Sequence, residues 1–146
     1  MNTLSRLILG TAFSLALAAC AAGPRAGSAS LYDRLGGQPA ITAVVDDFVA
    51  NVAADKRING QFANTNIPRL KMLLVEQICA GTGGPCQYTG RDMKSAHAHL
   101  KIGEADFAAL VEDLSRTLDK FKVPVKEQGE LIAILAPMKG DIVTVK

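Results

Sequence analysis

Apolar residues recur at intervals of three and four positions along most of this 146-residue chain. Such stripes run through residues 41–52, 70–78 and 107–121. This spacing places apolar side chains on one face of an α-helix, whereas a half-buried strand needs alternation in steps of two. Only residues 142–145 alternate weakly in that way. The sequence therefore predicts an all-helical fold.

Glycine and proline mark the expected ends of the helices. The glycine pair at 36–37 ends a short helical turn that begins at Leu31. Pro68 suits the first turn of a helix, and we expect this helix to end at Cys79. The glycine-rich residues 81–86 that follow cannot continue a helix and form a loop.

The charge of the chain is nearly balanced. Its 16 Lys and Arg residues and 14 Asp and Glu residues give a formal net charge of +2. A near-neutral chain without a basic stripe gives no reason to propose nucleic acid as a partner. Its length is enough for one domain with a single core.

The N-terminus has the features of an export signal. Arg6 precedes an apolar run that ends in small residues before Cys20, and this run is too short to span a bilayer comfortably. The Leu-Ala-Ala-Cys ending resembles the bacterial lipoprotein signal, in which the cysteine is lipidated and becomes the mature N-terminus. An ordinary cleaved signal and an uncleaved anchor are the alternatives.

These features divide the chain into three parts. Residues 1–19 form the signal, residues 20–30 form a flexible tether rich in Gly, Ala, Ser and Pro, and residues 31–146 form the folded domain. We expect the protein in the bacterial cell envelope, facing the periplasm, with the lipid on Cys20 as its contact with a membrane.

Export also affects the other two cysteines, Cys79 and Cys86. An exported protein meets an oxidising compartment, and the lipid occupies Cys20. The remaining pair flanks the glycine-rich loop, which is flexible enough to bring the sulfur atoms together. We therefore expect a Cys79–Cys86 disulfide, with two free thiols as the alternative.

The two histidines, His97 and His99, lie in one short segment. Neutral imidazole is the commonest side-chain ligand for metals and the usual proximal ligand of haem iron. Met93 precedes His97 by four residues, so on a helix both lie on one face, which Leu100 extends. This apolar strip suits a flat macrocycle with a central metal, and it equally suits an ordinary core or surface histidine. His99 points about 200° away from His97 on a helix, and we expect it at the surface.

Six short motifs follow one another along the chain. They are Leu31-Tyr32-Asp33 with Gly36-Gly37, Phe62-Ala63-Asn64-Thr65, Gly83-Gly84-Pro85, Tyr88-Thr89-Gly90-Arg91, Met93 with His97, and Phe107. Together, from Leu31 to about Val143, they resemble the truncated haemoglobins of group I. The resemblance implies a globin-like two-over-two helical sandwich around one haem b.

The resemblance also implies roles for individual residues. His97 matches the histidine that binds the iron, Phe62 matches a phenylalanine that packs on the haem face, and Tyr88 matches a tyrosine that reaches a propionate. The positions that match the wall of the haem pocket are Met93, Ile102, Phe107 and Leu135.

The chain departs from the family on the side of the haem where gases bind. The family usually places a tyrosine on the second helix, and the matching residue here is Val49. The facing helix usually contributes glutamines or a histidine, where this chain has Leu70, Leu73 and Leu74. Leu73 stands where some relatives carry a second iron-binding histidine, which argues against coordination by two histidines. Gln77 is the one amide that could reach inward, and a solvated glutamine is the alternative.

The sequence thus favours a haem b protein that binds O2, NO or CO at an open sixth position of the iron, with an electron donor that the sequence does not identify. Nitric oxide dioxygenation belongs to some relatives, but it needs oxygen held and polarised by a donor, so we do not expect an enzyme. The alternative function is a haem-free globin-fold lipoprotein with a structural or interaction role. Retention of the residues that match haem contacts argues against it.

Overall fold

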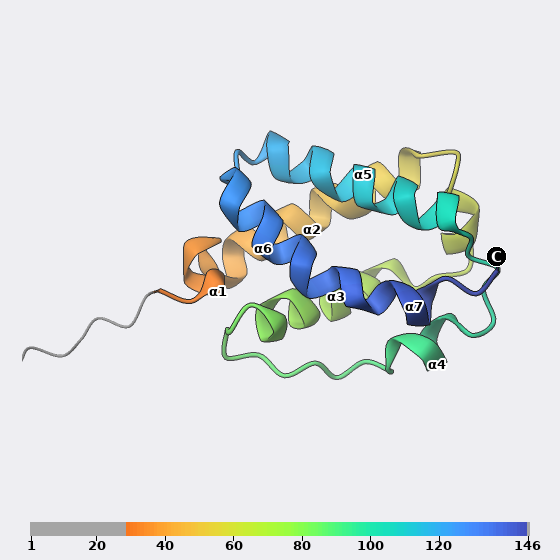
Figure 1. Cartoon of the computed structure of the whole chain (residues 1–146), viewed down its shortest axis with the longest axis horizontal. Helices are drawn as coiled ribbons and strands as arrows, with labels where there is room; N and C mark the ends of the chain where they lie inside the picture. Colours follow the sequence, from red (N-terminus) through yellow and green to blue (C-terminus); the bar gives the residue numbers. More distant parts are fainter. Residues whose placement is uncertain (1–28, 146) are drawn as a thin grey trace, which may run out of the picture.

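Four long helices, arranged as two antiparallel pairs, form the body of the protein (Figure 1). One pair is α2 (Gly37–Ala54) with α3 (Ile67–Gly81), and the other is α5 (Glu104–Lys120) with α6 (Val125–Leu135). The shorter elements are α1 (Leu31–Arg34), η1 (Asn59–Phe62), α4 (Met93–His97), η2 (Ala136–Met138) and α7 (Lys139–Ile142).

The computed structural model describes residues 29–145. The predicted signal, Cys20 and most of the predicted tether lie outside the described residues. Within residues 29–145 the chain forms no strand, as the apolar periodicity predicts. No helix in this part of the chain is long and apolar enough to cross a membrane.

The helix α2 lies at the centre of the packing, because it contacts both α3 and α5. Its apolar stripe is fully buried; the buried residues are Ile41, Val44, Val45, Phe48, Val49 and Val52. Val45, Leu118 of α5 and Leu131 of α6 are each only 1% exposed. Each fully buried side chain of this kind contributes about 1.5–3 kcal/mol. The burial of these stripes therefore positions the two helix pairs against each other.

The turn between α1 and α2 needs glycine. Gly36 and Gly37 have φ angles of 93° and 71°, which lie in the left-handed region that favours glycine. A Cβ atom on Gly36 would also lie only 2.9 Å from Cβ of Ala40. The predicted break at this glycine pair is confirmed, and α2 begins at its second glycine.

One arginine attaches α1 to α6. Arg34 Nε lies 3.0 Å from Glu127 Oε1, and its Nη2 pairs with Glu130. Its Nη1 donates a hydrogen bond to the carbonyl oxygen of Ala29 at 2.9 Å. The hydrogen bond from Arg34 lowers the pKa of Glu127, so this buried carboxyl group is ionised at neutral pH. The start of the described chain is thereby held beside α6.

The helix α3 is two residues longer than the sequence predicts. The expected end at Cys79 is wrong, because the helix continues to Gly81. The N–H and the hydroxyl of Thr82 both donate to the carbonyl oxygen of Ile78, at 2.9 Å and 2.6 Å. These bonds satisfy a carbonyl group of the last helical turn, so the helix continues past Cys79.

The sulfur atoms of Cys79 and Cys86 are joined in the structure, and the two Cα atoms are 5.7 Å apart. Cys79 is completely buried, whereas Cys86 lies in the partly exposed segment after α3. The link closes the glycine-rich loop onto the end of α3 and fixes where the chain toward α4 begins.

Another expectation from apolar spacing is wrong. Phe121 continues the stripe of α5 in the sequence, but the helix ends at Lys120 and the Phe121 side chain is 40% exposed. The chain reverses here, because Lys122 has a φ of 54° and the Val123 N–H donates to the Leu118 carbonyl at 3.0 Å.

The weak alternation at residues 142–145 does not form a strand, in agreement with the predicted all-helical fold. Ile142 ends α7, and the following residues are extended without strand pairing. Their backbone groups bond instead to the link between α4 and α5.

A carboxyl group on the buried side of α5 lacks a suitable partner. Asp113 is 0% exposed, and neither carboxyl oxygen accepts a hydrogen bond from the described residues. Arg116 Nη1 lies 3.1 Å from one oxygen, but the arginine side chain is 60% exposed. Burial, together with the charge of Asp55, raises the pKa of Asp113. The ionised form is therefore costly in the folded protein.

Because the pKa of Asp113 is higher in the folded than in the unfolded chain, its contribution to stability falls as the pH rises above about 4. We expect Asp113→Asn to raise the free energy of unfolding by about 1 kcal/mol at neutral pH, with a smaller gain near pH 4.5. Urea unfolding at both pH values measures the difference. Asp119→Asn, at an exposed position on the same helix, is the matched control. A variant less stable than the native protein at neutral pH would mean that Arg116 more than offsets the cost of burial.

Candidate functional site

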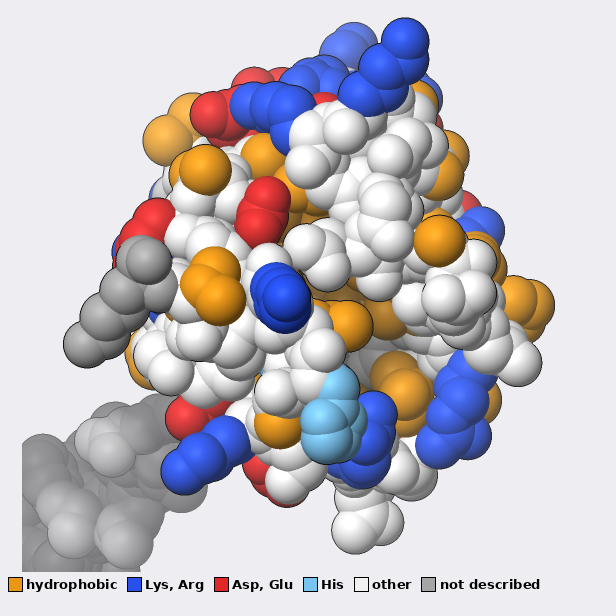
Figure 2. Space-filling view, turned by 90° about the vertical axis from the view of Figure 1, so that its right-hand side faces the viewer, with side chains coloured by type: hydrophobic (Ala, Val, Ile, Leu, Met, Phe, Trp, Pro, Cys, Tyr) orange, Lys and Arg blue, Asp and Glu red, His pale blue; other side chains and the backbone are white. Residues whose placement is uncertain are grey.

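A cavity of about 410 Å³ lies between the helix pairs. Its lining comes from α2, η1, α3, α4, α5, α6 and the residues up to Ile142. Figure 2 shows a hollow on the end of the molecule that carries α4 and α7, with hydrophobic side chains inside it and a histidine and basic side chains beside it. Its volume lies within the range of about 300–1,000 Å³ that is usual for ligand pockets.

The short helix α4 carries His97 to this cavity. Asp92 caps the helix by accepting a hydrogen bond from the Ser95 N–H at 2.8 Å. Hydrogen bonds from Ser95 lower the pKa of Asp92, so an ionised carboxylate stands at the positive end of the helix. His97 is the last residue of α4, is half-buried, and lines the cavity.

The hydrogen bond of His97 defines its tautomer. The Nδ1 atom lies 2.7 Å from the carbonyl oxygen of Met93. A carbonyl oxygen can only accept, so Nδ1 carries the proton and donates it. In this tautomer the Nε2 atom has a free lone pair. A backbone carbonyl on Nδ1–H is the usual arrangement that orients a metal-binding imidazole.

The structure brings every residue predicted for the haem pocket to this one cavity. The lining includes Val49, Phe62, Leu70, Leu73, Leu74, Gln77, Tyr88, Met93, His97, Ile102, Phe107 and Leu135. Val49 and Ile102 are buried, at 5% and 9% exposure. The individual roles of these residues stay predictions.

Gln77 does reach inward, but its amide already has a partner. Its Nε2 atom lies 2.9 Å from Sδ of Met138 and 3.9 Å from Sδ of Met93. The amide hydrogens therefore point toward sulfur atoms of α4 and η2. They do not point along α3 toward Leu70 and Leu73.

Tyr88 is also hydrogen-bonded within the protein. Its hydroxyl donates to the Arg91 carbonyl oxygen at 2.9 Å. Burial, followed by the charge of Glu76, raises the pKa of Tyr88. The ring folds over Gly90, where a Cβ atom would lie 2.2 Å from the hydroxyl oxygen. The glycine of the Tyr-Thr-Gly-Arg motif is thus required for this ring position.

The cavity lining also includes residues that the sequence analysis did not indicate. Gln61 donates to the Lys101 carbonyl oxygen at 3.2 Å, and the Asp106 carboxylate accepts from the Gly103 N–H at 2.9 Å. Met138 also lines the cavity. Its position follows from the turn at η2, which the apolar spacing of α6 does not indicate.

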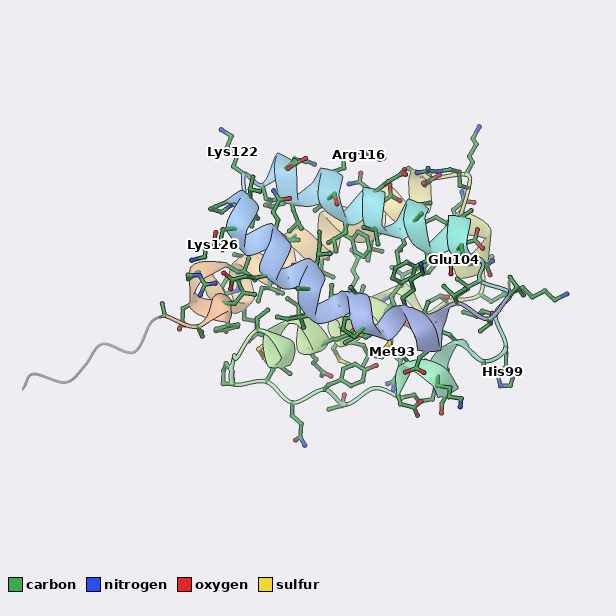
Figure 3. The ribbon with its side chains drawn as sticks, in the orientation of Figure 1. Met93, His99, Glu104, Arg116, Lys122 and Lys126 are labelled. Atoms are coloured by element: carbon green, nitrogen blue, oxygen red, sulfur yellow. A yellow bond between two sulfur atoms is a disulfide. The ribbon has the colours of Figure 1, made fainter. Side chains whose placement is uncertain are left out.

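His99 lies outside α4, and its side chain is exposed and points away from the molecule, as the sequence predicts (Figure 3). The same view places Met93 between α4 and α7.

Known proteins share both the sequence and this geometry. The sequence model of the family described as bacterial-like globin matches residues 30–144 of this chain. The chain belongs to this family of truncated globins.

Its relatives include the group 1 truncated haemoglobin of Mycolicibacterium paratuberculosis, 38% identical over 120 residues that cover 82% of this chain and 88% of the relative. The group 1 truncated haemoglobin of Nostoc commune is 33% identical over 77% of this chain and 96% of its own.

Solved structures of truncated haemoglobins share the fold. The Tetrahymena pyriformis protein in its Fe(III) form has a TM-score of 0.75 and 28% identity, and the match covers 79% of this chain and 98% of that protein. The 2/2 hemoglobin of Synechococcus, solved in the cyanomet state with covalently attached heme, has a TM-score of 0.75 and 30% identity over the same shares. The predicted all-helical two-over-two fold is confirmed. Membership of this globin family implies haem binding.

Proposed function

We propose that this globin holds haem b through His97 and binds small diatomic gases, O2, NO or CO, at the open sixth position of the iron. The observation that carries the proposal is the His97–Met93 hydrogen bond, which leaves Nε2 free on a residue that lines the cavity.

The other residues of the cavity fit this cofactor. Haem has two apolar faces, which suit a lining dominated by Val, Leu, Ile and Phe. It also has two carboxylates at its rim, for which Arg91 offers a cation. Tyr88 also lines the cavity, and its hydroxyl would have to exchange its bond to the Arg91 carbonyl oxygen to reach a carboxylate. When bound, haem supplies an iron atom that can coordinate a gas molecule on the side opposite the histidine.

The residues on the gas side determine which gas is held. We assign this side to Val49, Leu70 and Leu74, with Leu73 at its edge. None of these side chains can donate a hydrogen bond. The nearby amide of Gln77 is bonded to Met138. Oxygen becomes a hydrogen-bond acceptor when it binds, whereas carbon monoxide does so far less, so this wall retains oxygen poorly.

This chemistry favours binding or sensing of NO or CO, or short-range gas handling, over oxygen storage. Nitric oxide dioxygenation needs oxygen that is held and polarised, and the proposed wall supplies no donor for that step. We therefore propose a gas-binding protein and not an enzyme. The electron donor that reduces the iron is a separate partner.

We further propose that the protein is exported and anchored by lipid on Cys20. The apolar N-terminal run and the Leu-Ala-Ala-Cys ending support this proposal. The pairing of Cys79 with Cys86 in the structure suits an oxidising compartment such as the periplasm.

The ligand assignment is tested by removing the imidazole. We expect His97→Gly to lose the Soret band of the purified protein and to regain it when imidazole is added. His99→Gly, which removes the exposed histidine, is the matched control and should keep the full band. A His97→Gly protein that keeps its band without imidazole contradicts the assignment. A native protein without any Soret band supports a haem-free structural role instead.

The gas side is tested by restoring a donor at Val49. We expect Val49→Tyr to slow oxygen release by about ten- to a hundredfold relative to Val49→Phe, because only the tyrosine hydroxyl can donate to oxygen. Carbon monoxide release should be equal in the two variants. Stopped-flow dissociation from the reduced proteins measures both rates. Slow oxygen release from the native protein would reveal a donor on the gas side, with Gln77 as the first residue to replace.

All three cysteines are expected to be modified in the mature protein. Mass spectrometry of the membrane fraction should find lipid on Cys20. Thiol titration of the unreduced, unfolded protein should find no free thiol, because Cys79 and Cys86 are paired. Cys86→Ser should expose one thiol, and reduction of the native protein should cost about 2–3 kcal/mol of stability. Two reactive thiols would disprove the disulfide. An unmodified N-terminus cleaved at another position would disprove the lipid anchor.

A further inference from the structure

The last described residues are hydrogen-bonded to the link between α4 and α5. The Thr144 and Val145 N–H groups donate to the Ile102 carbonyl oxygen at 2.9 Å and 3.1 Å. The Thr144 hydroxyl accepts from the Ile102 N–H at 3.0 Å and donates to the Leu100 carbonyl oxygen. We call residues 143–145 the C-terminal strap.

The helix before the strap is attached to the same region. Lys139 of α7 pairs with Glu104, the first residue of α5. Its Nζ atom lies 5.8 Å from the centroid of the Phe107 ring, which lines the cavity. A Cβ atom on Gly103 would be 3.6 Å from Cγ2 of Val145, so the strap also packs on the start of α5. Figure 1 shows the end of the chain beside the link that leads from α4 to α5.

The helix α4 depends on these attachments because it has few of its own. It has five residues, and a helix of that length is not stable in isolation. Among the described elements, its main packing partner is α7. His97 is its final residue, and only three residues separate His97 from Lys101 at the start of the strapped link. The backbone on both sides of His97 is thus held, by α7 against α4 and by the strap on the link that follows.

We propose that Thr144 is a positioning residue for His97. Its hydroxyl accepts from the N–H of Ile102 and donates to the carbonyl oxygen of Leu100. Both of these residues line the cavity. A hydroxyl can serve both backbone groups at once, because it has one hydrogen to donate and lone pairs that accept. The inference rests on the proposed haem ligation by His97, and it adds that the C-terminus determines how firmly that histidine is held.

The test compares Thr144→Val, which keeps the shape and removes the hydroxyl, with Thr144→Ser, which keeps the hydroxyl. Thr42→Val is the matched control, since Thr42 is exposed and its hydroxyl bonds only to the Gln38 carbonyl oxygen in α2. We expect Thr144→Val to release haem to excess apomyoglobin about tenfold faster than the native protein. Thr144→Ser and Thr42→Val should release it at close to the native rate.

Two further readouts separate positioning from general stability. The iron–histidine Raman band of the reduced protein should shift or broaden in Thr144→Val alone. Amide hydrogen exchange should accelerate in residues 98–103 of that variant and stay unchanged in α2 and α5. Native behaviour of Thr144→Val in haem release and in the Raman band overturns the proposal, as does a Thr144→Ser variant with the same defect.

The haem-free protein distinguishes this inference from the proposed function. If the native protein binds no haem, the proposed function fails. Exchange of the Ile102 amide in the haem-free Thr144→Val variant then tests the strap itself. An unchanged exchange rate shows that the hydroxyl does not hold the link.

Discussion

The hydrogen bond between His97 Nδ1 and the Met93 carbonyl oxygen connects the local structure of α4 to the chemistry of the cavity. It forms because the two residues are one helical turn apart in α4, which Asp92 caps and α7 packs against. A weaker cap or a displaced helix would free the ring to rotate and would leave the tautomer undefined. In the proposed function, this five-residue element is the part of the protein that holds the iron of the haem.

The long helices enclose the cavity as well as forming the hydrophobic core. α2 and α5 bury side chains between each other, and the same two helices also line the cavity. Apolar walls around a space of about 410 Å³ lose the dispersion contacts that a filled interior would give. A ligand that fills the space therefore stabilises the folded state as well as serving function. The buried carboxyl group of Asp113 carries a separate cost, which a ligand does not remove because Asp113 is not among the residues that line the cavity.

Much of the fold follows from the sequence, because the apolar stripes of four long helices are strong local signals. The cavity residues could be named because the resemblance to a known family assigns each of them a position. Where tertiary contacts determine the position of a residue, the sequence contains no comparable local signal. Phe121 fits the helical stripe, yet the reversal at Lys122 leaves it exposed. Gln77 turns toward Met138, which only the turn at η2 brings close. The alternation at residues 142–145 indicates an extended chain but not its partner, which is the backbone of Ile102.

The attachment of Arg34 to α6 also places the start of the described chain relative to the opening of the cavity. Arg34 holds the carbonyl group of Ala29 at the end of the long axis that carries α1. The hollow opens at the other end, beside α4 and α7 (Figures 1 and 2). If the proposed lipid anchors the chain, the tether therefore joins the folded domain at the end opposite the opening and does not cover it. Gases and a reducing partner would then approach from the aqueous side, without competition from the anchor.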